Sequence, residues 1–103
     1  MIVLAEEPYG WYLFDDMGQL FLDVLVEHGA ISYSIAVELN EKESADYFRD
    51  GTAFLMQKAN QMRHEAITKQ WITRPLPSDW PQRSIKAVHA WQKKREEDSS
   101  ATR

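Results

Sequence analysis

The stretch WYLFDDMGQLFLDVLVEHGAISYSIAVEL, residues 11–39, decides the fold, because two parts of it alternate between apolar and other residues. Alternation with a period of two is typical of a β-strand that buries one face. In residues 19–27 the alternate positions are all aliphatic: Leu20, Leu22, Val24 and Val26. Residues 30–39 repeat the pattern with Ile31, Tyr33, Ile35, Val37 and Leu39. The stretch predicts neighbouring antiparallel strands.

A loop of two-residue hairpin length, His28-Gly29, separates these strands. With this loop, the sequence predicts that Glu27 faces Ala30, Leu25 faces Ser32, Asp23 faces Ser34 and Phe21 faces Ala36. Upstream, residues 11–16 join the sheet through a turn at Asp16-Met17-Gly18. This arrangement places Trp11 and Leu13 on the core face and Tyr12 and Phe14 on the outer face. Residues 1–5 are a candidate for one further strand.

Helical signals follow the sheet. Asn40 and Glu43 fit a capping box, in which each residue satisfies a backbone amide of the other. Small and apolar residues then recur at helical spacing: Ala45, Phe48, Thr52, Leu55, Ala59, Met62 and Ala66. Asp50-Gly51 interrupts this stripe, so the helix either tolerates the glycine or splits in two; we expect a helix that continues through the glycine, straight or bent. Residues 74–82 hold three of the four prolines and predict a linker, and residues 83–95 predict a second helix.

The expected fold is therefore α+β: an antiparallel meander of three or four strands packed by one long helix, with a second C-terminal helix after a Pro-rich linker. Residues 1–95 form a single domain in this interpretation, and residues 96–103 a frayed polar tail. The chain has no cysteine, which excludes disulfides and thiolate metal sites. The N-terminus resembles neither a signal peptide nor a membrane span, so we expect a cytoplasmic protein.

Charge is distributed unevenly along the chain. Residues 1–50 hold eleven acids against Lys42 and Arg49, a net charge of −9, whereas residues 51–103 carry +5. No Lys or Arg occurs before position 42. Such asymmetry indicates either an electrostatic match within the molecule or a partner of one sign.

The outer sheet face is the first candidate site. It interleaves large apolar residues with acids, namely Tyr12, Phe14, Phe21 and Leu25 with Asp16, Asp23, Glu27 and Glu38. An exposed face of this composition would suit a basic protein partner. Alternatively, the basic C-terminal helix covers the face, with Trp80 or Trp91 over the aromatics and Lys86 or Lys93 near the acids. Both alternatives are compatible with the sequence.

Other motifs favour no catalytic or metal site. Asp15-Asp16 could bind a cation, but aspartates are also favoured in turns, which is the preferred interpretation here. His64-Glu65 lacks the second histidine of a zinc-protease helix, because position 68 is Thr68. The acidic aromatic region lacks the bases that direct nucleic-acid binding needs. We therefore predict no catalytic, cofactor or metal residue, no enzyme activity, and no nucleic-acid or membrane partner.

In size, acidic meander, lack of cysteine and abundance of aromatics, the chain resembles the small cytoplasmic immunity proteins of bacterial contact-dependent growth-inhibition and other polymorphic toxin systems. The region that carries the resemblance is WYLFDDMGQLFLDV with its following hairpin. The resemblance implies a protein-binding inhibitor of a cognate toxin with a basic, nuclease-type surface. Under this hypothesis Asp15, Asp16, Asp23, Glu27 and Glu38 pair with toxin Lys or Arg, and Trp11, Tyr12 or Phe21 provide aromatic anchors.

Two other function classes remain open at this stage. One is a small accessory or regulatory subunit of a bacterial complex, with the sheet edge or the Trp80 segment as its contact. The other is an enzyme whose site is assembled from distant residues, such as His64, Glu65 and Asp23.

Overall fold

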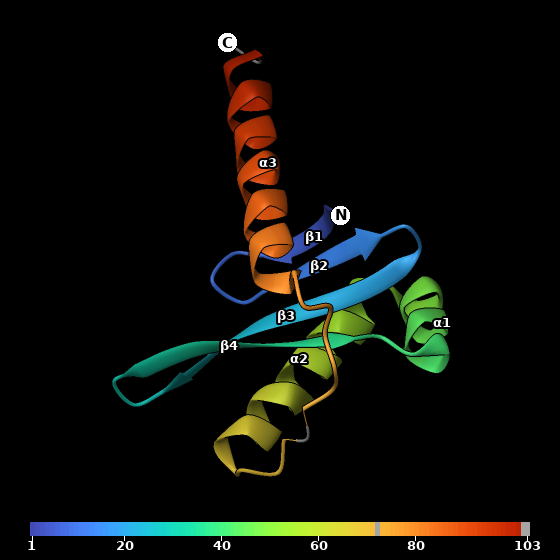
Figure 1. Ribbon diagram of the computed structural model, residues 1–103, viewed down its shortest axis with the longest axis vertical. Helices are drawn as coiled ribbons and strands as arrows, with labels where there is room; N and C mark the ends of the chain where they lie inside the picture. Colours follow the sequence, from blue (N-terminus) through green and yellow to red (C-terminus); the bar gives the residue numbers. More distant parts are fainter. Residues whose placement is uncertain (72, 102–103) are drawn as a thin grey trace.

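The computed structural model describes residues 1–71 and 73–101, which form a four-stranded antiparallel sheet and three helices (Figure 1). This confirms the predicted α+β class, and the candidate first strand is part of the sheet. The strands lie in sequence order: β1 (Ile2–Glu7), β2 (Trp11–Asp16), β3 (Gln19–His28) and β4 (Ile31–Glu38). The helices are α1 (Glu41–Asp50), α2 (Thr52–Ile67) and α3 (Trp80–Ala101).

The turn between β3 and β4 differs from the prediction by one residue. Its loop is Gly29-Ala30, since His28 pairs with Ile31, and Asp23 consequently faces Ala36 rather than Ser34. The reason is the backbone of Gly29, whose φ of 65° suits the first central position of a type II′ hairpin turn. The predicted pairs are thus wrong by two residues, but a shift of two leaves every side chain on its predicted face.

The turn between β2 and β3 agrees with the prediction. Asp16 pairs with Gln19, so Met17 and Gly18 form the loop. Both have positive φ, 53° and 92°, as a type I′ turn requires. The carboxylate of Asp15 accepts a hydrogen bond of 2.9 Å from the Gly18 amide, which confirms the turn interpretation of the Asp15-Asp16 pair.

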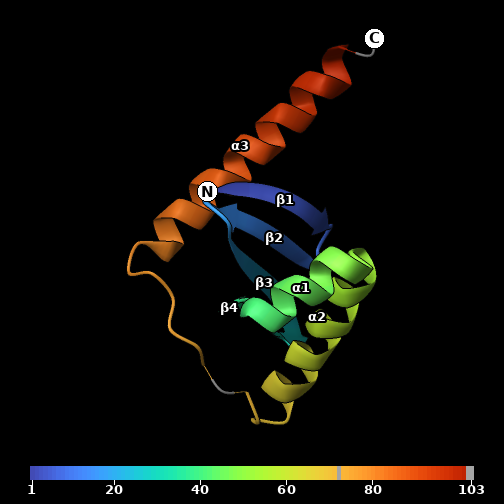
Figure 2. The same ribbon diagram turned by 90° about the vertical axis from the view of Figure 1, so that its right-hand side faces the viewer.

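Both faces of the sheet are covered (Figure 2). On one face, here called the inner face, side chains of β2, β3 and β4 pack against α2 in a core whose members are at most 4% exposed: Trp11, Leu13, Leu20, Leu22, Val24, Val37, Leu39, Leu55, Ala59 and Met62. On the opposite, outer face, a smaller cluster packs against the first half of α3: Val3, Phe14, Phe21, Trp80 and Ala87. The predicted alternation of β2 and β3 is the basis of both layers.

The predicted continuous helix is wrong, because α1 ends at Asp50 and α2 begins at Thr52, after a bend at Gly51. This glycine has φ 62° and ψ −134°, a combination that side-chain-bearing residues rarely adopt, and it ends α1 and begins α2. The bend turns α1 away from the sheet. Of the predicted stripe, Leu55, Ala59 and Met62 are buried, whereas Phe48 on α1 is 75% exposed.

Helix α1 is held by its N-terminus. The predicted capping box is confirmed, since Asn40 Oδ1 accepts from the Glu43 amide at 2.8 Å and Glu43 Oε1 from the Asn40 amide at 3.0 Å. The Glu43 carboxylate also forms ion pairs with Arg74 Nη1 at 2.6 Å and with Lys58 Nζ at 2.7 Å. Burial alone would raise the pKa of Glu43, but the hydrogen bonds from Arg74 and Lys58 lower it to about 2. This cluster joins α1, α2 and the segment that leads to α3.

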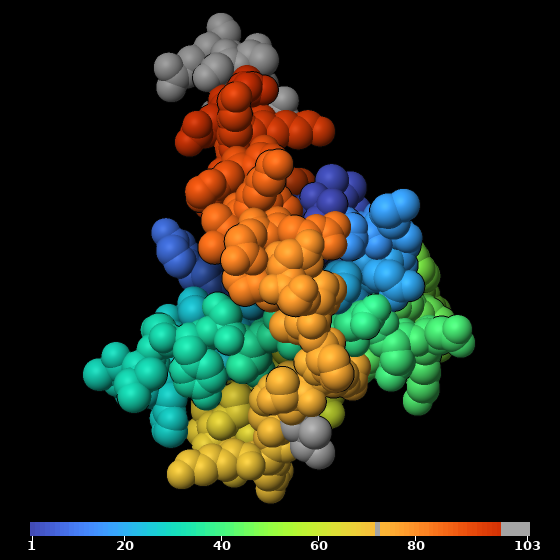
Figure 3. All heavy atoms as spheres, in the orientation of Figure 1, coloured from blue at the N-terminus to red at the C-terminus, as the bar shows by residue number. Residues whose placement is uncertain are grey.

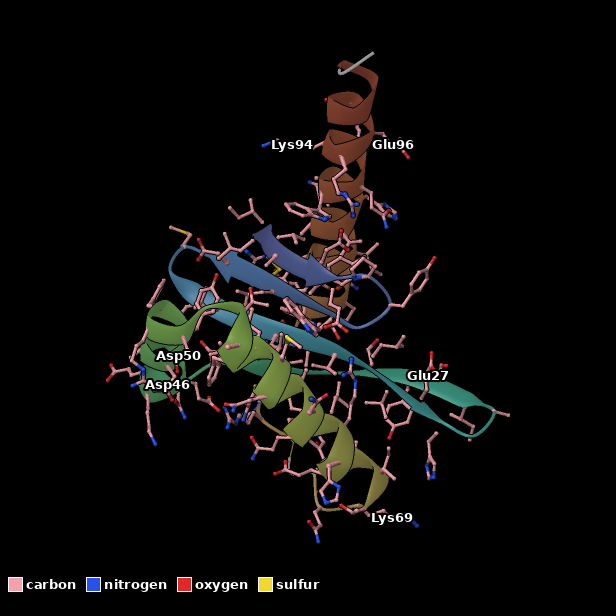
Figure 4. All side chains as sticks on the ribbon, turned by 180° about the vertical axis from the view of Figure 1, so that it is seen from behind. Glu27, Asp46, Asp50, Lys69, Lys94 and Glu96 are labelled. Atoms are coloured by element: carbon pink, nitrogen blue, oxygen red, sulfur yellow. The ribbon has the colours of Figure 1, made fainter. Side chains whose placement is uncertain are left out.

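Helix α3 is longer than predicted at both ends. It begins at Trp80 rather than Arg83, with Pro81 in its first turn, where the missing amide hydrogen costs nothing. It continues to Ala101, so residues 96–101 of the expected frayed tail are helical, while positions 102–103 lie outside the described residues. The last turns, with Lys94 and Glu96, extend beyond the sheet (Figure 4). No helix in the described ranges is both long and apolar enough to cross a membrane.

We expect Gly51→Ala to lower the free energy of unfolding by about 1–3 kcal/mol, because alanine has to adopt a strained backbone conformation at this bend. Urea unfolding followed by circular dichroism measures the change, with Ala53→Gly as the control for helix propensity alone. Unchanged stability of Gly51→Ala would show that α1 and α2 can join into one straight helix.

Candidate functional site

Helix α3 docks on the outer face through Trp80. The indole of this residue is 7% exposed and lies across two phenylalanines of the sheet. Its ring centroid is 5.3 Å from that of Phe14, in an edge-to-face arrangement, and 5.0 Å from that of Phe21. Such pairs stabilise beyond the area they bury. The alternative that the C-terminal helix covers the outer face is therefore confirmed for the part that contains Phe14 and Phe21.

Arginines rather than the expected lysines pair with the acids beneath α3. Arg83 Nη2 lies 2.5 Å from Asp16 Oδ1, and its hydrogen bond lowers the pKa of this carboxyl. Farther along the helix, Arg95 contacts Glu6, whose carboxylate also accepts the Trp91 indole N–H at 2.9 Å. These contacts join acids of the first half of the chain to bases of the second half. Part of the charge asymmetry is thus matched within the molecule.

Helix α3 leaves a cleft over the part of the outer face nearer the β3–β4 hairpin. This outer cleft has a volume of about 610 Å³ and lies between α3, the β1–β2 loop and strands β2, β3 and β4. Figure 3 shows α3 over the sheet and the hairpin beside it, not covered by the helix. Polar groups from every surrounding element line the cleft: Glu6, Tyr12, Asp23, Ser34, His89, Gln92 and Arg95.

Asp23 is the distinctive group of this cleft. Its position in β3 directs the side chain outward, opposite Tyr12 on β2 and Ala36 on β4. Burial raises the pKa of its carboxyl to about 6, and burial is the single cause of this shift. In the part of the chain that the structure describes, no hydrogen bond or ion pair compensates the carboxylate. A largely buried acid without a counter-charge, beside an open cavity, is a candidate for binding a ligand cation.

Tyr12 and Glu6 form the neighbouring wall of the cleft. Burial, followed by the negative charge of Glu6, raises the pKa of the Tyr12 hydroxyl, so Tyr12 remains a neutral hydrogen-bonding group. Tyr9 lies at the rim on the β1–β2 loop, with φ 61° and 94% of its surface exposed. The cleft thus combines a buried carboxylate with one half-buried and one fully accessible aromatic ring.

Two residues predicted as partner anchors are part of the core instead. Trp11 is 3% exposed and packs on the inner face, where its indole N–H donates to Glu7 at 3.1 Å. Phe21 is 2% exposed beneath Trp80. Neither can contact a partner across the surface, because α2 and α3 cover the two faces of the sheet.

The structure brings together Tyr12 and Asp23 among the predicted site residues. Asp15 and Asp16 lie at the β2–β3 turn and are engaged by the Gly18 amide and Arg83. Glu38 lines a separate surface hollow with Phe48 and Arg74. Glu27 is exposed near the tip of the β3–β4 hairpin (Figure 4). The predicted set is therefore spread over four regions and does not form one contiguous acidic face.

Several cleft residues escaped the sequence interpretation. Ser34 is not among them, since the predicted register already placed it on the outer face opposite Asp23; the observed register places it opposite Leu25 on the same face. Tyr9 was given no role, because the sequence alone did not indicate that its side chain is exposed at the rim of the cleft. His89 and Arg95 reach the cleft only through the docking angle of α3, which no local pattern specifies.

A non-local catalytic set of His64, Glu65 and Asp23 does not form. His64 and Glu65 belong to α2 on the inner side, whereas Asp23 points to the outer face. Within the described ranges, no three histidine or carboxylate side chains are grouped in a way that could hold a metal ion.

Comparison of the chain with protein-family models, with curated proteins and with solved structures finds no match. What the outer cleft does is therefore argued from its residues.

We expect Trp80→Ala to lower the free energy of unfolding by about 3 kcal/mol or more, because it removes the ring that covers Phe14 and Phe21. Urea unfolding monitored by fluorescence measures the loss. Ile85→Ala on the same helix is the matched control, since Ile85 is 57% exposed and its truncation should cost little. Equal effects of the two substitutions would contradict the docking of α3 through Trp80.

Asp23 should make the protein less stable as pH rises from about 4 to about 6. The unfolded chain releases this proton near the ordinary pKa of 3.8, whereas the folded chain retains it until about 6. Asp23→Asn should therefore raise the free energy of unfolding at pH 7 by up to about 3 kcal/mol, and by little at pH 4. Urea unfolding at both pH values tests this, with exposed Glu27→Gln as control. An Asp23 carboxyl that titrates near 4 by NMR would refute the prediction.

Proposed function

We propose that this chain is a protein-binding inhibitor of the immunity-protein type, which neutralises a basic partner by receiving one of its Lys or Arg side chains in the outer cleft. The observation that carries the proposal is the uncompensated carboxylate of Asp23 at the wall of an open cavity. The resemblance of the acidic aromatic region to immunity proteins supports the same class of function.

Energetics favour a cationic group as the occupant. Removing a carboxylate from water costs free energy. At Asp23 folding has already removed much of this water before any partner binds, as the raised pKa of the carboxyl indicates. An incoming ammonium or guanidinium supplies the missing opposite charge in surroundings where Coulomb attraction is stronger than in water. On binding, the main remaining desolvation cost is therefore that of the partner's cation.

The surroundings of the cleft suit a protein better than a small cation. Tyr9 at the rim and Tyr12 inside offer aromatic contacts of the kind that are enriched at binding hot spots. Exposed Glu27 adds negative charge on the neighbouring hairpin, which would speed the approach of a basic surface. Tyr9 and Tyr12 thus take the anchoring role that was assigned to Trp11 and Phe21.

Inhibition follows from competition for the same basic side chains. A nuclease binds phosphate through Lys and Arg, and electrostatic contacts dominate that affinity. A partner residue that is paired with Asp23 and packed on Tyr9 cannot contact nucleic acid at the same time. In this proposal, the inhibitor blocks the substrate surface and needs no chemistry of its own.

Growth rescue is the direct test. Each reading frame adjacent to the gene for this chain is expressed in a bacterial host with and without the chain, and colonies are counted. We expect one product to stop growth and the wild-type chain to restore it. Purified complexes then provide Kd by calorimetry, and Asp23→Asn should weaken binding about thirtyfold at pH 7.5.

The control for this experiment is Glu96→Gln, which removes the same charge on the projecting part of α3 and should leave Kd unchanged (Figure 4). Wild-type affinity should also fall at pH 5, where protonation of Asp23 removes its charge. If no adjacent product is toxic, or if rescue and Kd are insensitive to Asp23→Asn, the proposed function is wrong.

A further inference from the structure

The two edges of the sheet are protected to different extents. Edge strand β1 is interrupted by a bulge between Val3 and Ala5 and is followed by Pro8. Edge strand β4 has eight residues in unbroken register with β3, and its one charged residue is Glu38 at the end. Bulges, prolines and charges are the usual means of preventing an edge from pairing with another strand. β4 has almost none of them.

The register identifies which backbone groups of β4 are free. In a hairpin with a two-residue loop, the flanking residues His28 and Ile31 pair with each other, and pairing alternates along the strand. Backbone groups of the even-numbered residues Ser32, Ser34 and Ala36 therefore point away from β3. A contact of Arg74 agrees with this alternation, because its Nη1 donates to the carbonyl of Glu38, another even-numbered residue, at 3.1 Å on the side away from β3.

The segment after α2 covers β4 at its Glu38 end, and the hairpin end is open (Figure 1). Ile31 is 65% exposed and Tyr33 38% exposed, and Ser32 and Ser34 are exposed as well. The Ser34 side chain also lines the outer cleft. The free edge and the cleft are therefore adjacent parts of one surface.

We propose that the free edge of β4 pairs with an extended segment of the basic partner, and that a Lys or Arg of this segment crosses Ser34 into the outer cleft to contact Asp23. This inference rests on the proposed function and adds how the partner is bound: by strand addition, with basic residues on the side that faces α3. Main-chain pairing would supply affinity, and the cleft would supply selectivity.

The distances permit this arrangement. Neighbouring strands are about 4.8 Å apart, so the added strand would run roughly 10 Å from β3. The Asp23 side chain and an extended Lys or Arg, built from bonds of about 1.5 Å, together span that distance. The path crosses Ser34 and Ala36, whose small side chains leave it open. Basic residues at alternate positions of the segment would all point to this face.

Charge favours a basic partner over a second copy of this chain. Two copies joined edge to edge would bring together the acids of both hairpins, while residues 1–41 contain no Lys or Arg to balance them. A basic strand at the open end of β4 meets Glu27 and Asp23 with opposite charge instead.

Amide hydrogen exchange by NMR tests the proposal on the full chain. The probe is an acetylated and amidated seven-residue peptide in which threonine alternates with arginine. We expect it to slow exchange of the Ser32, Ser34 and Ala36 amides at least about tenfold. The same peptide N-methylated at its arginines retains the charge but cannot pair, and should give no protection.

Matched variants separate the edge from the cleft. Ser34→Pro removes an outward N–H without breaking the ladder to β3 and should abolish protection, whereas Ser34→Ala retains the N–H and the open path to the cleft and should preserve it. Asp23→Asn should reduce peptide affinity but leave the pattern of protected amides intact at saturation.

Protection that requires both the peptide N–H groups and the Ser34 N–H would establish strand addition. A peptide that perturbs the Asp23 resonance without protecting β4 would overturn strand addition and leave the proposed cation site intact. If the peptide protects β4 but binds the Asp23→Asn variant as tightly as the wild type, the contact with Asp23 is wrong, and this result also counts against the proposed function. If the β4 amides become protected without peptide as the protein concentration rises, the strand that pairs with β4 belongs to a second copy of this chain, and the proposed partner strand is wrong.

Discussion

The outer half of this molecule depends on the packing of one indole, Trp80, across Phe14 and Phe21. Alternation along β2 and β3 places both phenylalanine rings on the face opposite α2, where they would otherwise be exposed to water. Covering them with Trp80 fixes the start of α3, and the direction of the helix then determines which acids meet a base. Arg83 reaches Asp16 and Arg95 reaches Glu6 because they lie on the same helix as Trp80. Among the residues that the structure describes, Asp23 has no such partner, because the helix passes to one side of it.

The internal ion pairs change the meaning of the charge asymmetry. From the sequence, eight acids without a base before position 42 suggested one broad acidic surface. In the folded chain two of these acids, Asp16 and Glu6, are paired with arginines. Asp15 and Glu38 lie away from the outer cleft, so the acids that border it are few. The acids of the proposed binding surface are Asp23 within the cleft and exposed Glu27 on the hairpin, and the outer edge of β4 lies beside them. A small surface of this kind can select a partner by position as well as by charge.

Much of the fold was accessible from local patterns. The strands, the outward positions of Tyr12 and Phe14, the turn at Met17-Gly18 and the capping box of Asn40 and Glu43 were all predicted, because each rests on residues close in sequence. The errors arose where backbone conformation at a glycine decided the outcome. Gly29 moved the β3–β4 loop by one residue and the register by two, and Gly51 divided the expected long helix.

The candidate site was predictable only in part. The sequence by itself determined that Asp23 and Tyr12 share the outer face, since β-strand side chains alternate whatever surrounds them. It also determined that the second half of the chain carries the bases that could meet these acids. Only the tertiary structure decided which acids are matched, that Trp11 and Phe21 are buried, and that Asp23 borders a cavity. Those outcomes depend on where α3 crosses the sheet, and that crossing is set by contacts between Trp80 and residues about sixty positions away, which no local pattern encodes.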